Sequence, residues 1–201
     1  MPSKRLLKIF RNNIGSCNGE SDFKENLYEK IIVYGSEYGT TKEYAAKFSE
    51  ISNIPIINCD NINSLLEYDM VIHFGGLYAG GVKGLKKTIK SIKDTTKLIV
   101  VTVGLANVND VFNTDNIKKS IKKQIPEIIF NNTKIFHLRG GIDFSKLNIK
   151  HRTMMALLYR KAKNLPEEKK TAEVKAMIET YNQKISFVDF EKLKPILEAI
   201  R

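Results

Sequence analysis

One segment decides the fold of this chain: Lys30-Ile31-Ile32-Val33-Tyr34-Gly35-Ser36-Glu37-Tyr38-Gly39-Thr40-Thr41-Lys42-Glu43-Tyr44-Ala45. An apolar run ends at a short loop of Gly, Ser and Thr, and a helical pattern begins at once. Backbone N–H groups and the positive end of the helix dipole meet at such a junction and attract an anion. Gly35 and Gly39 let the backbone turn and approach the anion, and hydroxyl groups nearby can donate hydrogen bonds to it. The segment therefore predicts a phosphate-binding loop.

The spacing of the loop excludes three classes of phosphate site. A nucleoside-triphosphate loop requires a Lys before its Ser or Thr, and here Thr40 and Thr41 follow Gly39 directly. A dinucleotide fingerprint requires three glycines, and a Cys-dependent phosphatase requires a thiol in the loop. A simple helix-capping turn stays open as an alternative, because capping also favours Ser and Thr.

The loop resembles the FMN phosphate loop of the flavodoxins, which reads roughly Thr/Ser-x-Thr/Ser-Gly-x-Thr. The match departs from that pattern at Tyr38, which stands at the middle hydroxyl position. The resemblance implies FMN as cofactor, held at its phosphate by six residues: Ser36, Glu37, Tyr38, Gly39, Thr40 and Thr41.

Apolar segments alternate with helical patterns along the rest of the chain. Strands are expected over residues 31–34, 54–58, 70–74, 97–103 and 134–138, and helices over 41–51, 85–92, 115–124 and 149–163, with a short connection or helix over 62–68. Continuous apolar strands between helices indicate a parallel sheet covered on both faces. We expect an α/β fold: a flavodoxin-like, doubly wound five-stranded parallel sheet, with the order 2-1-3-4-5 that the resemblance implies, and a C-terminal helical extension. Residues 1–29 are an N-terminal extension and residues 30–201 the flavodoxin-like domain.

Two further loops lie at the carboxyl ends of the predicted strands, where ligands of such sheets bind. A phospho-acceptor receiver would need acidic residues at these ends, and the third strand ends instead in His73-Phe74-Gly75. By the flavodoxin resemblance the loops contact the flavin ring through Gly76, Leu77, Tyr78, Ala79, Gly80, Gly104, Leu105 and Asn107. Tyr78 is placed to cover a ring face. Asn107 and Asn109 can bond the pyrimidine edge or form Asx turns.

The C-terminal third is longer than in ordinary flavodoxins. It runs from Arg139-Gly140-Gly141-Ile142-Asp143 through the basic segment His151-Arg152-Thr153-Met154-Met155-Ala156-Leu157-Leu158-Tyr159-Arg160-Lys161 to Phe187-Val188-Asp189-Phe190. This order resembles the flavodoxin-domain family that includes the menaquinone-dependent protoporphyrinogen oxidases. In the basic helix, Met154, Leu157, Leu158 and Tyr159 are expected to share one face. Asp189 is expected to cap the last helix, with Phe187 and Phe190 in the core.

The net charge of +11 is unusual for a flavodoxin-like electron carrier, which the resemblance leads us to expect to be acidic. A cationic protein is attracted to anionic surfaces, so peripheral contact with an anionic membrane is one interpretation, and a lysine-rich proteome is another. The chain has two cysteines far apart and no recognisable secretory signal, which favours a cytoplasmic location, with the inner face of the membrane as the place of any such contact.

The leading hypothesis is an FMN-binding redox protein, resembling a protoporphyrinogen oxidase, with a redox partner protein, a quinone or a small molecule as its substrate. Two alternatives stay open: a flavodoxin-type electron carrier, and a non-redox binding module that kept the fold. The absence of Trp removes a stacking wall common in flavodoxins. No catalytic acid–base pair, metal site or nucleic-acid-binding motif is apparent, so nucleic acid is not expected as a partner.

Overall fold

The computed structural model describes residues 29–78 and 81–201, and its centre is a parallel β-sheet. Its strands follow the order β2-β1-β3-β5-β6, with bounds of Lys30–Gly35 for β1, Ile56–Asn58 for β2, Met70–Tyr78 for β3, Lys97–Gly104 for β5 and Lys134–Arg139 for β6. Adjacent strands pair in parallel throughout this path. The predicted α/β fold and the order 2-1-3-4-5 are confirmed.

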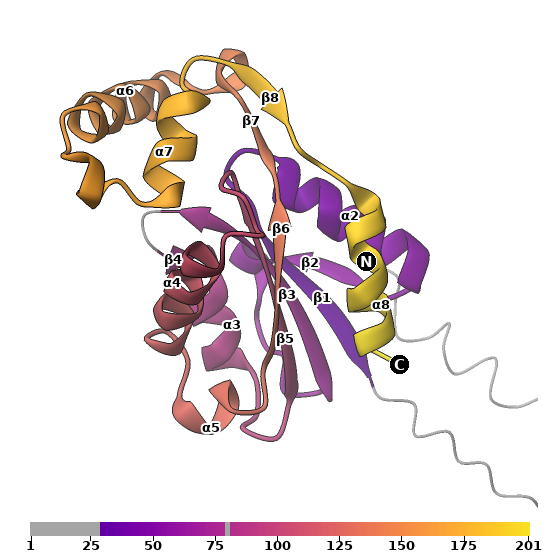
Figure 1. The fold of residues 1–201 in the computed structure, drawn as a ribbon. Helices are drawn as coiled ribbons and strands as arrows, with labels where there is room; N and C mark the ends of the chain where they lie inside the picture. The colour runs from indigo at the N-terminus through magenta and orange to yellow at the C-terminus, as the bar shows by residue number, and fades with distance from the viewer. Residues whose placement is uncertain (1–28, 79–80) are drawn as a thin grey trace, which may run out of the picture.

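Helices cover both faces of the sheet, as Figure 1 shows. Helix α2 (Thr40–Ser52) and the last helix, α8 (Lys194–Ala199), pack on one face, where Phe48, Phe74 and Ile196 belong to one apolar cluster. Helices α3 (Leu85–Ser91), α4 (Val111–Lys122) and α5 (Glu127–Phe130) contribute to the cluster on the other face. The central strands are buried on both sides, which explains their continuous apolar sequences.

The C-terminal extension leaves the sheet after β6 and returns to it through a small antiparallel pair. This pair joins β7 (Gly141–Asp143) to β8 (Lys184–Ser186), and Gly141 lies opposite Ser186. Between them lie helices α6 (Ile149–Lys163) and α7 (Ala172–Glu179) and the short 3-10 helices Phe144–Lys146 and Glu167–Lys169. A third apolar cluster holds this segment together and includes Tyr38 from the loop after β1. Figure 1 shows the segment standing over the carboxyl ends of the strands.

Several local expectations need correction. The second strand is shorter than predicted and begins at Ile56. Helix α4 begins at Val111, four residues early, because Asp110 caps it by accepting a hydrogen bond from the Asn113 N–H at 3.1 Å. The segment 62–68 is a connection without a helix. The pattern also missed α7, the β7–β8 pair, and β4 (Gly81–Val82), which runs antiparallel to β3.

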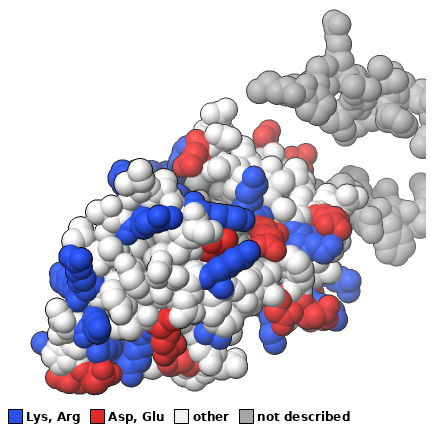
Figure 2. Space-filling view, turned by 90° about the horizontal axis from the view of Figure 1, so that it is seen from above, with Lys and Arg blue, Asp and Glu red and all other residues white. Residues whose placement is uncertain are grey.

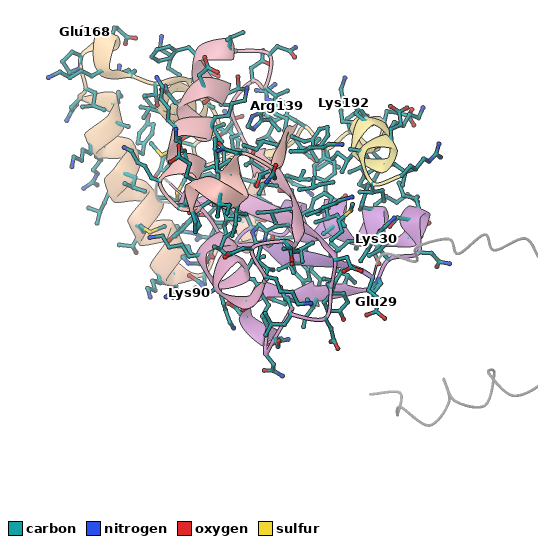
Figure 3. The ribbon with its side chains drawn as sticks, turned by 90° about the horizontal axis from the view of Figure 1, so that it is seen from below. Glu29, Lys30, Lys90, Arg139, Glu168 and Lys192 are labelled. Carbon is teal, nitrogen blue, oxygen red and sulfur yellow. The ribbon has the colours of Figure 1, made fainter. Side chains whose placement is uncertain are left out.

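The ends of the domain meet beside the first strand. Lys30 Nζ donates a hydrogen bond of 2.7 Å to the Ile200 carbonyl, so the start of β1 and the end of α8 are tied together. Figure 3 shows Lys30 and Glu29 in this region, far from Glu168 at the outer end of the C-terminal segment. The predicted N-terminal extension lies outside the described residues, apart from Glu29.

Asp189 caps the 3-10 helix Phe190–Leu193, which leads into α8, by accepting a hydrogen bond from the Glu191 N–H at 3.0 Å. The predicted core position of Phe190 is wrong. Phe190 is 38% exposed, and its ring packs edge to face against the buried Tyr44. No helix in residues 29–78 and 81–201 combines the length and the hydropathy that crossing a bilayer requires.

Candidate functional site

The loop after β1 turns sharply at Gly39, which is the N-cap of α2 with a φ of +100°. Such a φ favours glycine, and the position of a missing Cβ faces open space with no atom within 4 Å. No side chain caps the first turn of α2. The leading N–H groups of the helix are therefore left for an external acceptor, which is the geometry that an anion seat requires.

Hydroxyl groups surround this helix start. Ser36 Oγ accepts a hydrogen bond from the Gly39 N–H at 3.1 Å, which closes the loop and leaves the Ser36 proton to donate. Thr41 is only 4% exposed, and a Cβ built on Gly76 would meet its Oγ1 at 3.0 Å. Thr40 Oγ1 accepts a long hydrogen bond of 3.4 Å from the Gly141 N–H. These hydroxyl groups, gathered at a helix start, fit a phosphate group.

The predicted phosphate-loop residue Glu37 brings a negative charge to the loop, and a lysine and a histidine contact its carboxylate. Lys83 Nζ forms an ion pair with Glu37 Oε2, and His151 Nε2 lies 2.9 Å from Glu37 Oε1. Burial alone would lower the pKa of Lys83, but its hydrogen bond and charge interaction with Glu37 outweigh burial and raise that pKa. Glu37 is thereby held by protein partners and acts as a link between the loop, the β4–α3 connection and α6.

Lys83 and His151 were missed by the sequence reasoning. Backbone contacts fix Lys83: its N–H donates to the Gly76 carbonyl at 3.0 Å, and its carbonyl lies 2.9 Å from His73 Nε2. His151 stands in the first turn of α6, where the Asn148 side chain caps the helix and accepts from the His151 N–H at 2.8 Å. The one sequence signal was an acidic residue in a predicted phosphate loop, which calls for a nearby cation without saying which one.

Two tyrosines contact helix α6: Tyr38, in the loop after β1, and Tyr78, at the end of β3. The loops at the ends of β3 and β5, which carry Tyr78 and Leu105, are called the flavin-type loops below. The rings of Tyr38 and Tyr78 meet edge to face, with centroids 6.4 Å apart. The Tyr78 hydroxyl contacts Met154 Sδ at 3.2 Å, and the Tyr38 hydroxyl contacts Met155 Sδ at 3.8 Å. Burial, followed by the neighbouring Tyr78 and Glu37, raises the pKa of Tyr38 to about 12, so its phenol stays protonated at neutral pH.

A cavity of about 470 Å³ opens at the carboxyl ends of β3 and β5. Five predicted site residues line it: Tyr38, Leu77, Tyr78, Gly104 and Leu105. Helices α4, α6 and α7 complete its walls. A cavity of this size is in the range that holds small-molecule cofactors and ligands.

The structure does not bring every predicted residue to this cavity. Asn107 accepts a hydrogen bond from the Asn109 N–H at 3.0 Å, which is the Asx-turn alternative, and it lines a separate cavity of about 350 Å³ beside Arg139 and Lys175. Gly76 lies next to Thr41 below the loop. The predicted contacts of Ala79 and Gly80 lie outside the described residues.

The expected apolar face of α6 is partly wrong. Met154, Met155 and Leu158 line the cavity, whereas Leu157 is 62% exposed on the outer side of the helix. Tyr159 faces inward and stacks on Tyr181, with ring centroids 4.0 Å apart.

Comparison with known proteins adds the family. The family model described as "Flavodoxin domain" matches residues 31–169, which is more than half of the chain. The chain therefore belongs to the flavodoxin domain family. This membership, together with a helix start that is open to an anion, supports FMN as the cofactor.

Three solved structures share weaker similarity with the chain. A flavoprotein from Lactobacillus acidophilus NCFM, solved in complex with FMN, is 13% identical over 56% of this chain and 92% of its own, with a TM-score of 0.37. A candidate flavoprotein from Bacteroides uniformis is 14% identical over 56% and 91%, with a TM-score of 0.42. Another, from Bacteroides eggerthii, is 12% identical over 65% and 97%, with a TM-score of 0.39. A search among curated proteins finds no match.

Proposed function

We propose that this protein is an FMN-dependent oxidoreductase that acts on a small molecule. The observation that carries the proposal is the cavity at the carboxyl ends of β3 and β5, one side of which is built by the C-terminal helices α6 and α7. A protein that only passes electrons to a protein partner needs an accessible flavin edge, whereas a cavity beside the flavin loops suits a small substrate that enters it.

The residues of the chain divide the work of holding the cofactor. The first turn of α2, with Ser36 and Thr41, would hold the phosphate, and the loops that carry Tyr78 and Leu105 would hold the ring. Bound FMN would supply the electron or hydride transfer, which the protein controls through position and electrostatics. The protein would contribute a mostly apolar surface around the ring.

The finer proposal is an oxidase similar to the menaquinone-dependent protoporphyrinogen oxidases. The order of motifs from Arg139 to Phe190 supports it. The direct test is oxidation of a porphyrinogen by the FMN-loaded chain with a quinone as acceptor. Substrate turnover at a rate above that of free FMN supports the enzyme, and no turnover with rapid reduction by a redox protein would favour the electron-carrier alternative.

The cofactor itself has a simpler test. The purified chain should be yellow, or should take up added FMN with a shifted flavin absorption spectrum. A chain that neither carries FMN nor binds it at micromolar concentration would favour the non-redox binding module.

We also propose peripheral contact with an anionic membrane at the cytoplasmic face. The outer side of α6 exposes Ile149 and Leu157 among the basic residues Lys150, Arg160 and Lys161, a combination that suits an acidic lipid surface. Figure 2 looks onto this end of the molecule and shows Lys and Arg side chains spread across it between uncharged areas.

Flotation with vesicles tests this contact. The chain should float with vesicles that contain phosphatidylserine, and replacement of the three basic residues of α6 by Glu should abolish flotation. The matched control replaces Lys86, Lys90 and Lys93, exposed on or next to α3, by Glu, with the same change of charge and retained flotation. Equal loss in both variants would indicate attraction by net charge alone.

A further inference from the structure

The large cavity has two walls of different origin. One wall consists of the flavin-type loops, with Tyr78, Gly104 and Leu105. The opposite wall comes from the C-terminal segment between β7 and β8, which supplies Met154 and Met177 among others. The second wall lies outside the five-stranded core that carries the flavin-type loops, so its side chains can contact a molecule that lies beside the flavin.

The second wall is apolar and rich in sulfur. Three methionines line the cavity, Met154, Met155 and Met177, and Leu158 and Ile117 extend the same surface. Methionine side chains adapt their shape and make favourable contacts with aromatic rings. Inside the cavity, the Tyr78 hydroxyl donates a hydrogen bond to Met154 Sδ at 3.2 Å. This surface suits a flat aromatic ring.

One acidic side chain interrupts the apolar surface. Glu173, in the first turn of α7, lines the cavity and forms no hydrogen bond or ion pair with any residue in the described ranges 29–78 and 81–201. Although the residue is open at the mouth of the cavity, burial of its carboxyl group raises its pKa. An unpaired carboxylate at the mouth of an apolar cavity is accessible to a ligand that enters the cavity and can accept a hydrogen bond from it.

Two basic residues nearby, Lys175 and Arg139, do not supply a partner for this carboxylate, because they line the smaller cavity on the other side of α7. Glu179, on the same helix as Glu173, also lines that smaller cavity. On α4, Asn116 also lines the large cavity and has no hydrogen-bond partner within the described part of the chain. The cavity thus presents the Glu173 carboxylate and the Asn116 amide to a ligand, together with the hydroxyl groups of Ser120 and Thr171.

We propose that the cavity binds, next to the flavin, a flat aromatic compound that carries an amine or another N–H donor. The ring lies against the methionines, and the N–H group donates to the Glu173 carboxylate. This inference depends on the proposed function only in assuming that FMN is bound next to the ligand. The residues that would bind the ligand, Glu173 and the methionines, are present whether or not FMN is bound. The proposal therefore names the class of molecule that the oxidoreductase accepts.

Three naphthalene probes that share one ring system test the class. They are 1-(aminomethyl)naphthalene, 1-naphthylmethanol and 1-naphthylacetate, measured at pH 7.5 by naphthalene fluorescence on the full chain, which has no Trp to interfere. The amine should bind about tenfold more tightly than the alcohol, since hydrogen bonds to charged groups are worth this much or more. The carboxylate should bind most weakly. Equal affinity for all three would overturn the proposal.

Two variants of α7 locate the contact. Glu173→Gln should remove the preference for the amine and leave the affinity for the alcohol unchanged, which also shows that the variant is folded. Glu179→Gln, the same substitution on the side of α7 that lines the other cavity, should leave all three affinities unchanged. An amine preference that survives Glu173→Gln would contradict the assignment of the carboxylate.

FMN distinguishes a second site from the flavin seat. The amine should bind with similar affinity to the chain with and without FMN, and the two should form a ternary complex. One-for-one displacement of the amine by FMN would show that the cavity is only the seat of the flavin ring, and would overturn the inference. Amine binding that depends on Glu173 in a chain that binds no FMN would leave this site standing while the proposed function fails.

Discussion

At the scale of single residues, two glycines of the first loop are required for different reasons. A Cβ on Gly35 would lie 2.3 Å from the Lys83 carbonyl oxygen. A Cβ on Gly39 would contact no atom of the described residues, but Gly39 has a φ of +100°, which residues with a side chain rarely adopt. We expect Gly39→Ala to lower the free energy of unfolding by about 1 kcal/mol through backbone strain. Gly35→Ala should cost about 1–3 kcal/mol or more, because a backbone segment must move. Urea unfolding of both variants measures the difference, and a larger cost at Gly39 would contradict this reading of the loop.

Thr41 gives the sharpest residue-scale test of the phosphate seat. The residue is buried at the start of α2, and Thr41→Val keeps its shape while it removes the hydroxyl donor. The variant should bind FMN about tenfold more weakly, the value of one hydrogen bond to a charged group. Flavin fluorescence titration measures the affinity. Thr133→Val, where the hydroxyl bonds the Ile129 carbonyl next to α5, is the matched control and should bind FMN normally.

His73 makes stability depend on pH. The ring is fully buried between Thr88 and the Lys83 carbonyl, and burial lowers its pKa to about 4 despite the hydrogen bond to that carbonyl. Because the unfolded chain binds this proton near pH 6.5, stability falls as the pH drops from 6.5 toward 4. The loss attributable to His73 should reach about 2 kcal/mol at pH 5.

Unfolding at pH 7 and pH 5 measures this dependence. His73→Gln should be less stable at pH 7 and should lose less stability on acidification than the parent chain. His137, whose pKa burial also lowers to about 4, keeps part of the dependence in the variant. A variant with the same drop as the parent would exclude His73 as a source.

Single residues differ in how far the sequence could predict them. That Ser36, Gly39 and Thr41 hold a phosphate stays a prediction. The strand, turn and helix start that carry them were predictable because these parts are contiguous in the sequence. The partners of Glu37 were not, because Lys83 lies 46 positions away and His151 further still. Pairings of this kind depend on the tertiary fold, and no local spacing encodes them.

At the scale of elements, helix α6 is held to the loop after β1 and to the flavin-type loops by few contacts. Its first turn makes the His151–Glu37 contact, and its second makes the methionine–tyrosine contacts. Glu37→Gln should weaken the first of these, and amide hydrogen exchange over residues 149–155 should accelerate several-fold. The control Glu43→Gln, exposed on α2, should leave exchange in α6 unchanged. Unchanged exchange in both variants would mean that apolar packing alone holds the helix.

Elements with strong periodicity were predicted well, and those set by long-range packing were not. The apolar runs of β1, β3 and β5 and the bounds of α6 agree with the sequence pattern. The inward face of α6 does not, because Met154, Leu157 and Leu158 are all apolar, and only contact with Tyr78 and α7 decides which of them turns inward. The short strands β7 and β8 owe their existence to pairing with each other.

At the scale of the whole molecule, helices α6 and α7 belong to a unit inserted between β7 and β8, and the flavodoxin domain match extends into this unit, to residue 169. Residues 142–185 leave and return through Gly141 and Ser186, which are opposite each other in the β7–β8 pair. A shortened chain in which Asn-Gly replaces residues 142–185 should therefore fold, because a two-residue turn can join Gly141 to Ser186 on the neighbouring antiparallel strand. Circular dichroism and cooperative unfolding measure the outcome.

The shortened chain also separates the two ligands. It keeps Ser36, Thr41 and the loops after β3 and β5, so it should still bind FMN, although more weakly, and iodide should quench the flavin more strongly. It should no longer bind the naphthalene amine. A chain that fails to fold would show that the inserted unit is part of the core of the domain.

The packing of α8 has a consequence for the order in which the molecule is made. Leu193 and Ile196 complete the apolar surface beside Phe48 and Phe74, although they follow all five strands of the parallel sheet in the chain. Until they emerge from the ribosome, α2 is the one of the two helices on this face that can cover the nearly finished sheet. We therefore expect the nascent polypeptide to expose apolar surface at this stage of translation and to bind a chaperone.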